Sequence, residues 1–141
     1  MDKATARCIG ALAMLMSGLA LRVSMLRLGA IRGKNSEILR SKLFFNWSRA
    51  QINTAEYAPM FAILIIVLQM KANHSNDGKL TKRQQTYSYA CVIACAMFAA
   101  GVLKTELSDK LIPRGTNPLR FAGATARYVL LFLMSLDVVS L

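Results

Sequence analysis

The stretch that decides the fold is RAQINTAEYAP, residues 49–59, which leads directly into the apolar run MFAILIIVLQM, residues 60–70. An arginine, an asparagine and a glutamate therefore stand at the entrance of a segment that is otherwise apolar enough for a membrane. On a helix of 3.6 residues per turn, one polar stripe forms from Arg49, Asn53, Glu56 and Tyr57. Because a charge inside a spanning helix is costly, this stripe is expected to face the bundle interior, a cavity or a partner.

Four apolar runs account for most of the 141 residues, and 55% of the chain is hydrophobic. A spanning helix needs about 20 mostly apolar residues, so the runs predict spans at approximately 5–28, 49–71, 85–104 and 118–140. We expect a single domain over residues 1–141, an all-α integral membrane four-helix bundle. The first run could instead be a signal peptide, but basic residues follow it at once without a clear small-residue cleavage site, which favours an uncleaved span.

The charge balance is basic, with 18 Lys and Arg against 7 Asp and Glu. These basic residues lie between the apolar runs without an aromatic-basic motif, so nucleic acid is not an expected partner, whereas membrane lipids are. The connections 22–48 and 104–118 hold the larger share, and the positive-inside tendency predicts that both are cytoplasmic. One histidine and three cysteines give no credible metal site. Cys91 and Cys95, four residues apart, are expected to be small buried residues.

The polar stripe of the second span has two interpretations. In the structural one, Arg49 extends to the lipid headgroups and Glu56 pairs with an arginine from another helix. In the functional one, the stripe lines a pocket for a charged ligand. Arg49 then binds a carboxylate, Asn53 hydrogen-bonds a peptide-like group, and Glu56 accepts from an ammonium.

A second polar face runs along the fourth span, where Arg120, Gly123, Arg127 and Leu131 share one side of a helix. Arg120 stands at the entrance of that helix, and Arg127 lies about two turns deeper. The structural interpretation of Arg127 is an ion pair with Glu56. The functional one is an arginine that holds an anion, or stabilises a thiolate, inside the bundle.

The motif in residues 49–59, read as R-A-Q-x-N-x-x-E-Y-x-P, resembles the signature of the MAPEG family, the membrane-associated proteins in eicosanoid and glutathione metabolism. This residue pattern is especially similar to that of the leukotriene-C synthase and microsomal glutathione transferase branches. The sequence from Asn117 to Arg120, followed by Gly123, also resembles the opening of the family's fourth helix.

This resemblance implies a homotrimer in the endoplasmic reticulum or another organelle membrane, with glutathione as co-substrate between neighbouring subunits and a lipophilic second substrate. It assigns glutathione binding to the set Arg27 or Arg32, Arg49, Gln51, Asn53, Glu56 and Tyr57. Arg120 resembles the family arginine that is credited in some members with thiolate stabilisation, and Arg127 is the second candidate catalytic residue.

The chain departs from the family pattern at the end of the third span. Family members commonly carry R-x-x-Y or R-x-x-H there, whereas this chain has Gly101 in place of the arginine and Lys104 in place of the Tyr or His. Two functions follow. The first hypothesis is an enzyme, a glutathione transferase or peroxidase. It predicts that the stripe faces a cavity and that Arg120 or Arg127 reaches the thiol. The second hypothesis is a non-catalytic scaffold or a subunit of a larger membrane complex. It predicts that an arginine forms an ion pair with Glu56 and that no ligand-sized space remains. Retention of the whole 49–59 motif favours the enzyme.

Overall fold

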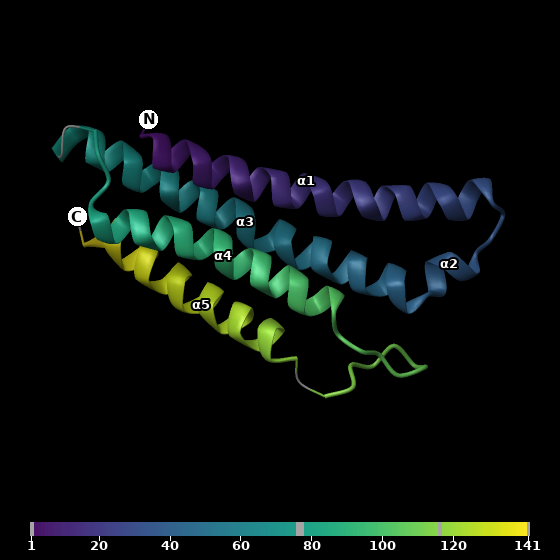
Figure 1. The fold of residues 1–141 in the computed structure, drawn as a ribbon. Coiled ribbons are helices and arrows are strands. Elements are labelled where there is room, and N and C mark those ends of the chain that lie inside the picture. Colours follow the sequence, from purple (N-terminus) through teal and green to yellow (C-terminus); the bar gives the residue numbers. More distant parts are fainter. Residues whose placement is uncertain (1, 76–77, 116, 141) are drawn as a thin grey trace.

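The computed structural model describes residues 2–75, 78–115 and 117–140, and long helices dominate it (Figure 1). The elements are α1 (Lys3–Arg32), α2 (Glu37–Arg40), α3 (Lys42–Ser75), α4 (Lys82–Leu103) and α5 (Pro118–Val139). All except the short α2 are long and apolar enough to cross a membrane. The predicted all-α, multi-pass membrane bundle is therefore confirmed. Residues 76–77 of the expected polar loop between the second and third spans lie outside the described residues.

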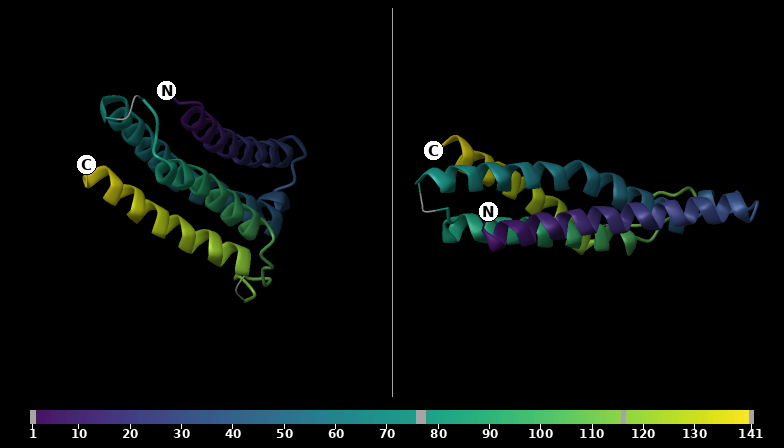
Figure 2. Two further views of the ribbon diagram at one scale, coloured as in Figure 1. Left: turned by 60° about the vertical axis from the view of Figure 1, so that its left-hand side comes forward. Right: turned by 90° about the horizontal axis from the view of Figure 1, so that it is seen from above.

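The four long helices lie alongside one another, with α1 against α3 and α4, and α5 against α4 and α3. The start of α1 and the end of α5 are at the same end of the bundle (Figure 1). The helices differ in length, because α1 and α3 have 30 and 34 residues and α4 and α5 have 22 each. At 1.5 Å per residue, α1 and α3 are about 10–20 Å longer. They extend past the others at the end that carries α2 (Figure 2).

The core confirms the expectation for Cys91 and Cys95, which are both fully buried on α4. They pack in one cluster with the large apolar side chains of α3, Phe61, Ile65 and Leu68. Cys8 of α1 belongs to the same cluster and is also buried. In the sequence Cys8 stands apart from the other cysteines, and only the packing of α1 on α4 brings it to them.

The beginning of α5 is determined by the residue before the helix and by its first residue. The Asn117 side-chain oxygen accepts hydrogen bonds from the backbone N–H groups of Leu119 and Arg120, at 3.1 and 3.3 Å. Pro118 occupies the first helical turn, where its missing N–H costs nothing. Together they set where the helix starts, and this places Arg120 in its first turn.

Helices α4 and α5 cross at two glycines. A Cβ atom added to Gly101 would lie 2.3 Å from the backbone nitrogen of Arg120, and one added to Gly123 would lie 2.5 Å from that of Phe98. These separations are far shorter than any van der Waals contact, so only glycine permits this approach. The crossing therefore fixes the position of Arg120 relative to α4.

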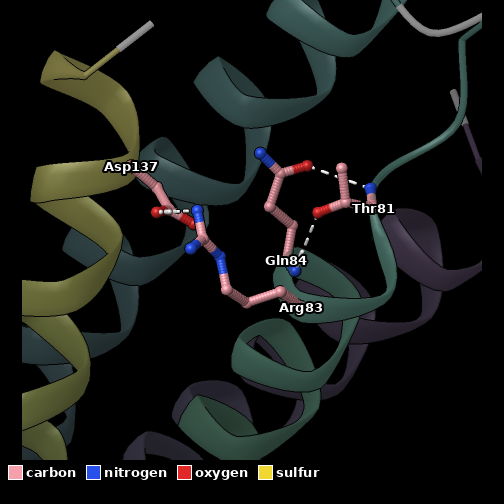
Figure 3. A network of polar contacts seen from close by, with 4 residues as sticks. All are labelled: Thr81, Arg83, Gln84 and Asp137. Carbon is pink, nitrogen blue, oxygen red and sulfur yellow. Dashed lines mark hydrogen bonds and ion pairs between the residues drawn. The ribbon is translucent and has the colours of Figure 1, made fainter.

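The opposite end of the bundle is joined by polar contacts. Gln69 of α3 accepts a hydrogen bond of 2.7 Å from the Thr5 hydroxyl of α1 and donates to the Gly78 carbonyl. Helix α4 begins with a capping box between Thr81 and Gln84 (Figure 3). Arg83, which lies between these two residues in the chain, donates to the Asp137 carboxylate of α5 at 2.6 Å (Figure 3).

The Arg83–Asp137 pair is expected to be asymmetric in its effect on stability. Asp137 is buried, whereas the Arg83 side chain is 65% exposed. Arg83→Gln leaves a buried carboxylate without its cation, and we expect it to lower the free energy of unfolding by about 2 kcal/mol. Asp137→Asn leaves an arginine that water can solvate, and should cost about 1 kcal/mol. Unfolding in detergent measures both, and the reverse order would contradict this account.

Candidate functional site

Arg127 is the most unusual side chain in the bundle, because it is a cation with only 2% of its surface exposed. Its guanidinium lies 3.6 Å from the centre of the Phe98 ring and 4.1 Å from that of the Tyr57 ring. Its Nη1 atom is 3.5 Å from the Asn53 carbonyl oxygen, a long hydrogen bond, and its Nε has no hydrogen-bond partner in the described part of the chain. Two aromatic faces therefore stabilise a charge that no carboxylate neutralises there.

A partly open cavity of about 340 Å³ begins at this arginine. Its lining comes from α3, α4, α5 and the connection that precedes α5. Its polar lining comprises Asn53, Asn117, Arg120 and Arg127, and its other lining residues are Phe98, Gly115, Phe121, Ala124 and Tyr128. Phe121 and Tyr128 are 68% and 60% exposed, so the rim of the cavity is aromatic. The space suits a ligand with both an anionic and an apolar part.

The residues of the polar stripe of α3 lie at different places relative to this cavity. Asn53 lines it, and Tyr57 lies behind it under Arg127. Arg49 is half-buried, stacks on Phe45 at 5.5 Å, and is close enough to Arg120 for the two positive charges to act on each other. Two arginines from different helices thus lie near one end of the cavity.

Glu56 is exposed in the single chain and is not among the residues that line the cavity. No ion pair joins Glu56 to Arg127 among the described residues, so the expected pair is not formed there. The structural interpretation of Arg127 as the partner of Glu56 is wrong for this chain taken alone. Adjacent helix positions differ by about 100° in direction, so Tyr57 can contact Arg127 while Glu56 stays exposed.

The remaining sequence candidates lie outside the cavity lining. Arg27 is exposed near the end of α1 and stacks on Phe44 of α3 at 5.9 Å. Arg32 is exposed in the last turn of α1, and Gln51 is half-buried on α3. The single chain therefore joins Asn53, Arg120 and Arg127 in one site, with Arg49 and Tyr57 beside it.

Comparison with known proteins agrees with this geometry. The model of the MAPEG family matches residues 5–139, nearly the whole chain. The chain belongs to the MAPEG family. Membership places it among membrane proteins of glutathione or eicosanoid metabolism, a class that suits a cavity lined by arginines with an aromatic rim. No curated protein and no solved structure matches the chain.

The departure from the MAPEG resemblance at Gly101 has a structural counterpart. Position 101 faces the backbone of α5 rather than the cavity, because the space beyond its Cα holds the backbone of Arg120. Lys104 is exposed and lines a neighbouring recess of about 250 Å³ with Glu106 and Arg114. That recess shares Gly115 and Asn117 with the main cavity, so Lys104 and Arg114 lie beside the cavity.

Phe98, Phe121 and Tyr128 are the site residues that the sequence analysis missed. A signal was present for two of them, because positions 120, 121, 124, 127 and 128 follow helical spacing and share a face of α5. Phe98 had no such signal, since it enters the site through the close approach of α4 at Gly123.

Proposed function

We propose that this MAPEG protein is a membrane-bound glutathione transferase or peroxidase that acts on lipophilic electrophiles or lipid hydroperoxides. The observation that carries the proposal is Arg127, a buried cation without a carboxylate partner among the described residues, at the wall of a cavity of about 340 Å³. An unneutralised buried charge is costly, so it is best explained by an anion that binds there.

The residues of the cavity fit glutathione as the anionic co-substrate. Arg49 and Arg120 would bind a carboxylate at the entrance, and the Asn53 side chain would hydrogen-bond a peptide group. Arg120 and Arg127 are seven residues apart on one helix face, or about 10 Å. This separation lets Arg120 hold a terminal carboxylate while Arg127 faces the thiol.

The chemistry that glutathione supplies is nucleophilic attack or peroxide reduction by its thiolate. A free thiol has a pKa of about 8.5, and a nearby cation lowers that pKa. Arg127 would therefore increase the thiolate fraction at neutral pH, and its low-dielectric surroundings strengthen the effect. The exposed rings of Phe121 and Tyr128 at the rim would admit an apolar second substrate from the bilayer.

The alternative function is a non-catalytic MAPEG scaffold or a subunit of a larger membrane complex. It is favoured by Gly101, where the backbone of α5 leaves no room for a side chain, and by Glu56, which does not line the cavity. Its other requirement, an arginine that saturates Glu56 and fills the site, does not hold among the described residues. We therefore rank it second.

Calorimetry with glutathione on the detergent-purified protein tests the proposal. We expect saturable binding by the unaltered chain and a loss of at least about tenfold in affinity for Arg49→Ala, because a charged hydrogen-bonding partner is worth about 1.5–3 kcal/mol. Glu56→Gln tests whether Glu56 binds the ligand from a neighbouring subunit. If so, it loses affinity similarly; otherwise it binds as the unaltered chain does.

Arg7→Gln is the matched control, because Arg7 is exposed on α1 and is not among the residues that line the cavity. It should bind glutathione with unchanged affinity. A folded, unaltered protein without measurable binding would reject the enzyme and leave the scaffold function.

A further inference from the structure

The overhang of α1 and α3 forms a separate feature, which we call the basic arm and define as residues 23–45. Two contacts mark where it begins. The Asn46 side chain of α3 donates to the carbonyl of Leu103, at the last residue of α4, and Arg22 of α1 stacks on Trp47 at 5.7 Å. Residues from 23 to 45 therefore lie beyond the end of α4 (Figure 2).

The arm is strongly basic. Glu37 is its one acidic residue, and its five basic residues are Arg27, Arg32, Lys34, Arg40 and Lys42. All six are exposed. Lys42 pairs with Asp109 at 3.0 Å, whereas the other four basic residues are not in ion pairs within the described ranges. The arm thus presents a cluster of uncompensated cations just past the apolar part of the bundle.

The same surface is also apolar. Met25, Leu28, Ile31, Leu39 and Leu43 of the arm are each between 41% and 70% exposed. At its base the aromatic rings of Trp47 and Phe44 stack with Arg22 and Arg27. Aromatic and basic side chains in this combination are typical of the boundary between acyl chains and headgroups.

We propose that the basic arm is a docking surface for anionic phospholipid, with headgroup phosphates on the basic residues and acyl chains along the exposed apolar ones. Charge complementarity identifies an anionic partner, because clusters of four to eight basic residues next to a spanning helix attract acidic lipids. The apolar side chains select a lipid over a soluble polyanion, which would leave them in water. None of the arm residues lines the cavity, and the test uses Lys34 and Arg40, which lie outside the set that the family resemblance assigns to glutathione.

Native mass spectrometry of the detergent-purified full chain can measure this binding, with dioleoyl phosphatidylglycerol as the anionic probe and dioleoyl phosphatidylcholine as the neutral one. We expect the chain to bind phosphatidylglycerol at least about tenfold more tightly, and the preference to weaken as salt rises. Lys34→Gln with Arg40→Gln should remove most of that preference. Both residues are exposed and lie outside the proposed glutathione site, so the fold should be unaffected.

The matched control removes the same charge at the opposite end of the bundle, through Lys79→Gln with Lys82→Gln, both exposed. It should keep the preference. An equal loss in the control would mean that net charge alone attracts the lipid, and an unaltered chain without preference would also overturn the proposal. Full competition by soluble glycerol 3-phosphate would indicate a simple phosphate site. A changed oligomeric state of the Lys34/Arg40 variant with unchanged lipid binding would assign the arm to a second copy of the chain.

Discussion

Arg127→Met is expected to lower glutathione-dependent turnover by about 100-fold or more while the bundle stays folded. The proposed role of the guanidinium is to stabilise a thiolate in a low-dielectric cavity, and methionine cannot do so. Methionine does match the volume of the arginine stem and packs well against aromatic rings such as those of Phe98 and Tyr57.

The effect of this substitution on stability should be small, because two terms oppose each other. Losing the cation–π contacts costs about 1–2 kcal/mol. Removing a buried charge without a carboxylate partner restores a similar amount. We therefore expect the free energy of unfolding to change by less than about 1 kcal/mol. Turnover with an aryl halide and with an organic hydroperoxide, together with unfolding in detergent, measures both quantities.

Two further variants make the result specific to the site. Arg127→Lys keeps the charge without the planar group that stacks on two rings, so it should recover part of the activity but not all of it. Arg7→Met removes an exposed arginine from α1 and should change neither quantity. The proposal is contradicted if the unaltered protein shows no turnover and Arg127→Met is severely destabilised. Arg127 would then serve only to hold the helices together.

The sequence predicted the helices well because their signals are local. Each long apolar run depends only on residues that are neighbours in the chain. The candidate site was predicted less completely. The 49–59 stripe covers an arc of about 100°, and only the packing of α5 decides that Asn53 lines the cavity and Tyr57 contacts Arg127 while Glu56 stays exposed.

Arg127 shows what a sequence alone leaves open. Helical spacing put it on one face with Arg120, which the cavity confirms. Spacing within α5 does not indicate whether Arg127 pairs with a carboxylate or lines a cavity, because that depends on where the Glu56 side chain of α3 lies. Contacts between helices determine the surroundings of Arg127, and no short motif encodes them.

Gly101→Ala is expected to be among the most damaging small substitutions in the chain. The added Cβ would lie 2.3 Å from the nitrogen and 2.6 Å from the Cα of Arg120. Both are backbone atoms, which cannot rotate aside as a flexible side chain can, so α5 must move away from α4. Overpacking of this kind costs about 1–3 kcal/mol, and the rigid neighbours place this position at the upper end.

Movement of α5 would also displace Arg120 and reopen the contact at Gly123, so glutathione affinity should fall with stability. Gly18→Ala provides the control, since a Cβ at Gly18 of α1 meets nothing within 4 Å. Alanine favours a helix over glycine by about 1 kcal/mol, so that variant should be as stable as the parent or more so. Unfolding in detergent compares the two alanines directly. If Gly101→Ala were as stable as Gly18→Ala, α4 and α5 would not cross as closely as described, and Arg120 would lose the constraint that places it at the cavity.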